Sequence, residues 1–220
     1  GGMGWLGWLA LLGALVTSLW LMDVLFYDSN RSADEWVGKI LYHLFGGTLA
    51  GLLIAFFEET FFRGMLFSSV KRESGLITAV VLSSILYSIM HFLITSKHPE
   101  GAALLWNSGL ALLPSLWDYM TNPVIFDSFV ALFMAGVFLA LVREYSGSIA
   151  LSIGLHAGWV AIIKTTKYLT DNNQSADLAW LVGSYDGITG WLGTLMLGLL
   201  SLPLIYLLRQ RQASQAQSET

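Results

Sequence analysis

The sequence predicts an all-α protein, a polytopic bundle of about six transmembrane helices with one further interfacial or re-entrant helix. Hydrophobic residues make up 55% of the 220 residues and charged residues 12%, whereas soluble domains carry roughly 25% charge. Apolar runs of about 20 residues, the length that crosses a bilayer, recur along the chain. We therefore expect an integral membrane protein with the lipid bilayer as its surroundings. Nucleic acid is an unsuitable partner because the net charge is −4 and no long basic run is present.

The spans are expected at 5–27, 37–57 with a continuation toward 70, 75–95, 124–142, 147–168 and 188–208. The first of them lacks a basic n-region, so we interpret it as a span and not as a signal peptide.

The segment 102–120 is less apolar, because it contains Asn107, Pro114 and Asp118. An interfacial or re-entrant helix suits it better than a span. Residues 1–209 are expected to form a single transmembrane domain, and the polar residues 210–220 a disordered tail.

Basic residues near the ends of the spans predict the orientation, because they favour the cytoplasmic side. They are Lys71, Arg72, Arg143, Arg209 and Arg211. The loops 28–36 and 169–187 carry acidic residues and mark the other side. Six spans then place both termini in the cytoplasm, in what we expect to be a bacterial inner membrane. A crossing at 102–120 would move the basic C-terminal end outside, which is our reason for excluding it.

Three charged residues interrupt the second apolar run, where each charge costs roughly 2.5 to 3.5 kcal/mol at the bilayer centre. Glu59 and Arg63 are four residues apart, so on a helix they share a face and predict a buried ion pair. Glu58 lies about 100° around the same helix and is left to point into a cavity. We interpret Glu58 as a working base and the other two as structural support. The alternative is that all three form one structural network.

Two histidines lie in similarly apolar segments, His91 and His156. Taken singly, each is more typical of a hydrogen-bonded packing residue. Glu58, however, lies about 20 Å along the helix from Lys71, and His91 about 24 Å from Gly75. Antiparallel spans would therefore bring a carboxylate and two imidazoles to a similar depth, which indicates a catalytic centre.

The chemistry that these groups suit is hydrolysis. The chain has no cysteine, no His-Glu-x-x-His pair and no Gly-x-Ser-x-Gly elbow. Glu58 can take a proton from a water that His91 orients, and His156 can stabilise the oxyanion of a tetrahedral intermediate. No cofactor is expected. A zinc ion held by the same three residues is the rival mechanism, because two histidines and one glutamate form a legitimate catalytic zinc site.

Three motifs resemble those of the CAAX-protease and bacteriocin-processing (CPBP, or Abi) family, whose pattern is Glu-Glu-x-x-x-Arg, Phe-x-x-x-His and His-x-x-x-Asn. Here they read Glu58, Glu59 and Arg63; Tyr87 and His91; and His156 and Val160. Tyrosine for phenylalanine is a mild change, but Val160 cannot bind an oxyanion as the family's asparagine is thought to do. Trp159 Nε1, Lys164, a backbone amide or a water are the possible substitutes.

The resemblance implies an intramembrane glutamic endopeptidase that cleaves a membrane-anchored protein or peptide without an obligatory metal. The stretch 148–159 looks most like the myxosortase-like branch, which removes C-terminal sorting tags. The alternative from another class is a non-catalytic immunity or scaffold protein of the same fold. Val160 favours that alternative, and the complete Glu-Glu-x-x-x-Arg motif opposes it.

Overall fold

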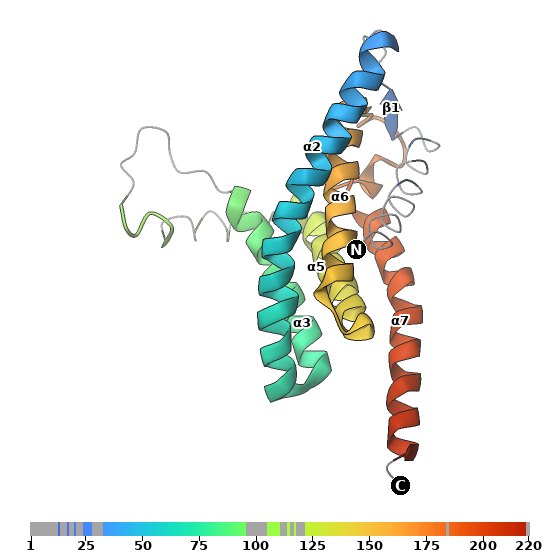
Figure 1. The fold of residues 1–220 in the computed structure, drawn as a ribbon. Coiled ribbons are helices and arrows are strands. Elements are labelled where there is room, and N and C mark those ends of the chain that lie inside the picture. The colour runs from blue at the N-terminus through green and yellow to red at the C-terminus, as the bar shows by residue number, and fades with distance from the viewer. Residues whose placement is uncertain are drawn as a thin grey trace.

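A computed structural model describes residues 24–27, 33–95, 105–110, 122–183 and 185–218, together with the single residues 13, 17, 20, 114 and 117. In chain order the elements are strand β1 (Leu25–Tyr27), helix α2 (Ala33–Glu59), the π-helix η1 (Thr60–Leu66), helices α3 (Phe67–Thr95), α5 (Pro123–Ser146) and α6 (Ile149–Leu169), strand β2 (Thr170–Asn172), the 3₁₀-helix η3 (Ala179–Leu181) and helix α7 (Trp191–Ser218) (Figure 1).

The protein is a bundle of helices, as the sequence predicted, apart from one short antiparallel pairing of β1 with β2 in the described part of the chain. Four helical runs there are long and apolar enough to span a membrane: Val37–Phe92, Ile125–Ser146, Ile149–Leu169 and Trp191–Gln215. The expected span 5–27 and the expected interfacial helix 102–120 lie largely outside the described residues. The count of six spans therefore stays a prediction.

The longest of these runs reverses its direction at Gly75. Its φ of 81° and ψ of 174° lie outside the helical region, in a conformation that glycine adopts far more readily than any other residue. Figure 1 shows α2 running to one end of the bundle and the rest of α3 running back beside it. The run Val37–Phe92 thus contains two antiparallel legs, which correspond to the spans expected at 37–70 and 75–95.

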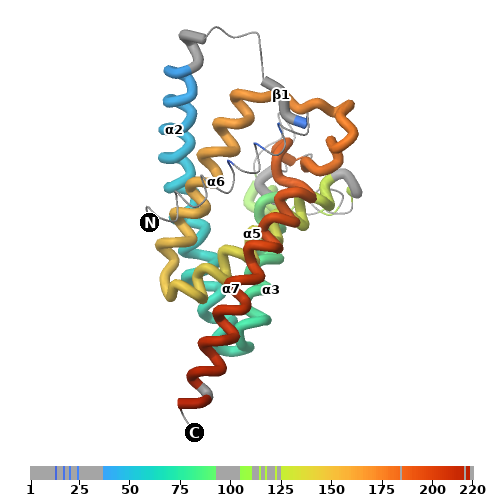
Figure 2. Tube along the Cα trace, turned by 90° about the vertical axis from the view of Figure 1, so that its right-hand side faces the viewer, coloured from blue at the N-terminus to red at the C-terminus, as the bar shows by residue number. Residues whose placement is uncertain are grey.

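Helices α2 and α6 lie side by side (Figure 2) and approach closely at two glycines of α2. A Cβ atom at Gly47 would lie 3.1 Å from the Cα of Ala161, and one at Gly51 would lie 2.7 Å from the carbonyl oxygen of Ala157. Small residues spaced four apart on both helices allow this approach. The contact matters because α2 ends in the two glutamates and α6 carries His156.

Helix α5 forms the centre of the bundle. Its glycine Gly136 packs against Ser84 of α3, since a Cβ atom there would lie 2.9 Å from the Cα of that serine. Ser88 of α3 and Ser152 of α6 donate hydrogen bonds to carbonyl oxygens of α5, at 2.9 and 3.3 Å. The small and polar residues of the apolar spans therefore hold the helices together.

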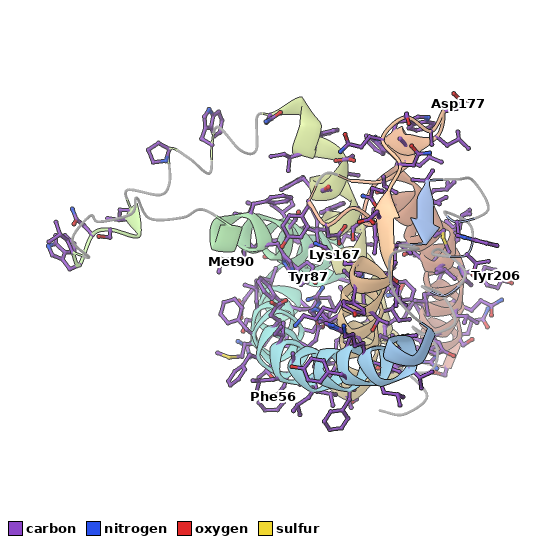
Figure 3. All side chains as sticks on the ribbon, turned by 90° about the horizontal axis from the view of Figure 1, so that it is seen from above. Phe56, Tyr87, Met90, Lys167, Asp177 and Tyr206 are labelled. Atoms are coloured by element: carbon purple, nitrogen blue, oxygen red, sulfur yellow. The ribbon has the colours of Figure 1, made fainter. Side chains whose placement is uncertain are left out.

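The outer surface of the bundle is apolar, as a lipid-facing surface should be. Large apolar side chains are exposed along α2, α3 and α7. Seen from above, Phe56 and Tyr206 lie at the periphery, whereas Tyr87 lies toward the centre (Figure 3).

The two ends of the bundle differ in charge. At one end, Lys71 pairs with Glu144 at 2.7 Å and Arg211 donates to the carbonyl oxygen of Tyr145 at 2.8 Å. These contacts bring the reversal within α3, the α5–α6 turn and α7 together. The loop 169–187 follows the opposite end of α6. The basic and acidic segments that the sequence assigned to different sides thus lie at opposite ends.

The expectation of a disordered tail at 210–220 is wrong for residues 210–218, because α7 continues to Ser218. Glutamine, arginine and alanine are good helix formers, so this polar segment extends the helix although it buries little surface. Arg211 stacks on the ring of Tyr145 at 4.1 Å, and Gln210 donates to the hydroxyl of Tyr206 at 2.6 Å. Polarity alone misled the sequence-based expectation.

Replacing Gly51 with alanine is expected to destabilise the protein by about 1–3 kcal/mol through overpacking, because the methyl would meet the Ala157 carbonyl oxygen at 2.7 Å. Gly46→Ala is the matched control, since nothing lies within 4 Å of its added methyl. Alanine should stabilise the helix there by about 0.5–1 kcal/mol. Thermal unfolding in detergent measures both, and equal stability of the two variants would contradict the close contact.

Candidate active site

The candidate site lies where α2, η1, α3 and α6 meet. Glu58 and Glu59 are the last residues of α2, Arg63 lies in η1, His91 in α3 and His156 in α6. The structure thus brings these five residues, which come from three sequence motifs, into one cluster. The turn that follows the glutamates is a π-helix, a widened helix that is frequent at functional sites.

The ion pair between Glu59 and Arg63 is present and fully buried. Arg63 Nη1 donates to Glu59 Oε1 at 3.0 Å, and both side chains are 0% exposed. Arg63 Nη2 donates to the carbonyl oxygen of Gly136 at 3.2 Å, and the guanidinium lies 4.4 Å from the centre of the Tyr87 ring. His156 Nδ1 lies 3.0 Å from the same Glu59 oxygen. This pair therefore connects η1 with α3, α5 and α6.

Glu58 points to the other side, toward two imidazoles. Its Oε2 lies 3.9 Å from His91 Nε2 and 4.0 Å from His156 Nε2. Both distances exceed a direct hydrogen bond, and both suit a bridging water. The Glu58 side chain is 22% exposed, whereas Glu59 is completely enclosed. The two adjacent carboxylates thus have different surroundings, as the helical spacing indicated.

The hydrogen bonds of the two histidines determine which nitrogen faces Glu58. His156 Nδ1 lies beside a carboxylate oxygen, and His91 Nδ1 lies 3.0 Å from the carbonyl oxygen of Tyr87. Both oxygens only accept, so each Nδ1 carries the hydrogen and donates. Each Nε2 is then directed at Glu58, as a lone pair in the neutral ring and as an N–H donor in the charged one.

Tyr87 is a site residue that sequence reasoning underrated. In the sequence motif it is only a tyrosine at the position of the family's phenylalanine. In the structure its buried ring lies 4.5 Å from the ring of His91 and 6.1 Å from that of His156. It also packs edge-on against Phe62 at 5.4 Å. The one signal in the sequence is the spacing of four residues from His91, which puts both on one helix face. Gly136, which binds Arg63 through its carbonyl, left no signal at all.

A cavity of about 380 Å³ opens beside the two histidines. It is lined by Tyr87, His91, Leu132, His156, Trp159, Val160, Ile163, Lys164, Lys167, Tyr185, Asp186 and Thr189. These residues lie on α3, α5, α6 and the loop before α7, so the cavity extends from the imidazoles toward the end of the bundle that carries the loop 169–187. Trp159 is buried in its wall, and Lys164 is exposed two turns beyond His156, about 12 Å along the helix.

Val160, at the position where the family resemblance predicts asparagine, lines this cavity one turn beyond His156. Its Cβ would lie 3.1 Å from a Cβ atom at Gly51, so the valine occupies the close contact of α2 with α6. An apolar side chain there strengthens helix packing and offers no hydrogen-bond donor to the site. Any oxyanion donor must therefore come from another group.

Within the described residues, no group of three or more histidine, aspartate or glutamate side chains is arranged so that it could hold a metal ion. The zinc alternative at Glu58, His91 and His156 stays a prediction.

Comparison with known protein families matches the chain to the family described as Type II CAAX prenyl endopeptidase Rce1-like, over residues 40–162. The match covers more than half of the chain and includes the five clustered residues. It confirms the resemblance inferred from the motifs. None of the curated proteins and none of the solved structures gives a significant match.

Breaking the buried ion pair should destabilise the protein strongly. Glu59→Gln or Arg63→Gln leaves the other charge without its partner in an apolar interior, at a cost of about 3–5 kcal/mol. The double variant should lose less than the sum of the two single variants, because it leaves no charge unpaired. Thermal unfolding in detergent measures the cycle.

The control for this cycle is Arg72→Gln, which removes an arginine whose pair with Glu73 is exposed at the basic end. Its unfolding temperature should stay that of the unmodified protein. Strict additivity of the two single changes would contradict a coupled pair.

Proposed function

The chain belongs to the Rce1-like family of type II CAAX prenyl endopeptidases, and from this premise we propose that it hydrolyses a peptide bond of a membrane-anchored protein or peptide by a glutamate-activated water. The membership identifies a protease of the CAAX type in a membrane-embedded helix bundle. The observation that carries the finer proposal is the position of Glu58 Oε2, 3.9 and 4.0 Å from the Nε2 atoms of two imidazoles.

In the proposed reaction, a water lies between Glu58 and His91, and Glu58 takes its proton. The water oxygen attacks the carbonyl carbon of the scissile bond, so the carbonyl oxygen becomes an oxyanion. Glu58 then returns the proton to the amide nitrogen, the C–N bond breaks, and an amine and a carboxylic acid, which keeps the second proton of the water, leave. Every proton is accounted for by one carboxylate.

His156 is the proposed oxyanion donor, because its second ring nitrogen is held by a carboxylate. When charged, it donates through Nε2 while Glu59 Oε1, 3.0 Å from Nδ1, stabilises the imidazolium. One such proton also balances the charge of the cluster, in which Glu58 and Glu59 otherwise outnumber Arg63 by one. This arrangement supplies a donor although Val160 offers none.

In zinc sites, too, the ring nitrogen that does not bind the metal commonly donates a hydrogen bond that orients the histidine. The Nδ1 atoms of His91 and His156 both have such a partner. This observation keeps the zinc mechanism as the second candidate. It does not favour a non-catalytic immunity or scaffold protein, which would have no need for Glu58 beside two oriented imidazoles in an apolar bundle.

The side from which the substrate enters follows from the cavity and the charge distribution. We propose that the basic end faces the cytoplasm of a bacterial inner membrane, with both termini on that side. The cavity beside His91 and His156 extends to the other end, so substrate and water would enter from outside, as a sorting-tag protease requires.

Glu58→Gln should lower turnover by at least about 100-fold while the protein still folds, because a neutral amide cannot take a proton from water. The assay is mass spectrometry of membrane peptides from cells that express the unmodified or the altered protein. Glu73→Gln removes an exposed carboxylate at the basic end and should leave the cleavage products unchanged. Equal cleavage by the Glu58→Gln protein would refute the assigned base.

Elemental analysis of the purified protein separates the two mechanisms. The glutamate mechanism predicts far less than one zinc per chain and activity that survives a chelator. Stoichiometric zinc, with activity lost to the chelator and restored by zinc, would establish the rival instead.

The orientation is tested by single cysteines, because the chain has none of its own. Residues Ser175 and Ala213 are both exposed and belong to opposite ends of the bundle. A membrane-impermeant thiol reagent should label Ser175→Cys in intact cells and Ala213→Cys only after lysis. Labelling in the reverse order would invert the topology and the side of entry.

A further inference from the structure

The wall of the cavity beside the histidines contains two lysines that the proposed chemistry does not use. His156, Val160, Lys164 and Lys167 follow one another on α6 at spacings of four, four and three residues, and all four line the cavity. Such spacing puts them on one face of the helix. The catalytic imidazole and the two ammonium groups therefore belong to a single continuous stripe.

Neither lysine is neutralised by its surroundings. Lys164 and Lys167 form no ion pair with any described residue. The one carboxylate in the wall, Asp186, accepts hydrogen bonds from the backbone N–H groups of Ile188 and Thr189 at 2.9 and 2.6 Å and from the Thr189 hydroxyl. Its oxygens accept hydrogen bonds within the loop before α7 and make no ion pair with either lysine. The described wall therefore carries an excess of positive charge.

Asp127 faces Lys167 from α5, across a neighbouring cavity that both residues line. Its Oδ1 accepts from the backbone N–H and the hydroxyl of Ser128, at 2.6 and 3.2 Å. This carboxylate is therefore also occupied by its own helix and makes no ion pair with the lysine.

The ordinary explanation of a lysine near a span's end is snorkelling, in which the ammonium reaches lipid headgroups. The position of these lysines opposes it. They line the same cavity as His91 and His156, and in the view from above Lys167 lies near the centre with Tyr87, whereas Phe56 and Tyr206 lie at the periphery (Figure 3). The positive charge is directed at the substrate path.

We propose that Lys164 and Lys167 bind a carboxylate of the substrate, on one side of the scissile bond. The inference rests on the proposed peptidase function and adds a determinant of specificity to it. Along α6 the two lysines lie about 12 and 16 Å beyond His156. An extended chain covers about 3.3 Å per residue, so the carboxylate lies roughly four to five residues from the cleaved bond.

The cavity between the two groups is suited to apolar residues. Leu132, Trp159 and Ile163 also line it, and the last two lie between His156 and the lysines along α6. The substrate class is thus a short apolar segment that ends in, or carries, a negative charge. The carboxylate can be the C-terminal one or that of an aspartate or glutamate side chain.

The test measures binding to full-length Glu58→Gln protein in phosphatidylcholine nanodiscs, so it needs no turnover. The probes are three pools of N-palmitoylated ten-residue peptides with randomised apolar positions. One pool has a free C-terminal carboxylate, one is amidated, and one is amidated with a glutamate among its last five residues. Mass spectrometry quantifies the retained peptides.

We expect one charged pool to be retained at least about tenfold more than the neutral amide pool, the usual effect of a charge-assisted hydrogen bond. Retention of the free-acid pool identifies a C-terminal carboxylate, and retention of the glutamate pool a side chain. Adding Lys164→Gln and Lys167→Gln should reduce the ratio to about one. Adding Lys164→Arg and Lys167→Arg should retain it.

The matched control adds Lys71→Gln and Arg72→Gln, which remove the same charge at the opposite end and should leave the ratio unchanged. Equal retention of all pools, or a ratio that survives the glutamine changes at Lys164 and Lys167, would overturn the inference. If the protein binds the charged pool selectively but the unmodified protein cleaves no peptide, the peptidase function alone is refuted. An active peptidase without selectivity refutes the carboxylate site alone.

Discussion

The buried ion pair of Glu59 and Arg63 is the interaction on which the site depends. Two charges with no exposed surface are tolerated in an apolar bundle only when they pair with each other and are held by further contacts. The guanidinium therefore reaches Gly136 on α5 and the ring of Tyr87 on α3, and the carboxylate reaches His156 on α6. Satisfying one pair of charges thus fixes the positions of the helices that carry the proposed catalytic groups.

Adjacent positions on one helix give two identical side chains different tasks. Glu59 faces inward and forms the ion pair with Arg63. Glu58 lies about 100° around the helix, and its Oε2 lies 3.9 and 4.0 Å from the Nε2 atoms of two imidazoles. The close packing of α2 on α6 at Gly51 sets this approach. Val160 belongs to that contact, so the residue that departs from the family motif strengthens the packing that holds Glu58 near His156.

Polar residues of the described bundle line a path from its centre to one end. The two histidines beside Glu58 and the two lysines of α6 border a single cavity, while the outer surfaces of α2, α3 and α7 are apolar. Such a division lets the bundle face lipid on the outside and still present water, proton acceptors and cationic groups to a peptide. The specificity that we infer therefore resides on the same helix as His156, the proposed oxyanion donor.

The sequence by itself determined the membrane-spanning helices of the described residues, the reversal near residue 75, the ion pair and the gathering of Glu58, His91 and His156 in one cluster. These features follow from local spacing and from the rarity of polar residues in apolar runs. Tertiary structure alone decided which backbone carbonyl orients Arg63, how closely Gly51 meets α6, and that Lys164 and Lys167 share a cavity with His91 of α3. Each of these depends on contacts between residues far apart in the chain, which composition and periodicity do not encode. The helical end of α7 belongs with them, because contacts such as that of Arg211 with Tyr145 accompany a segment whose polarity resembled disorder.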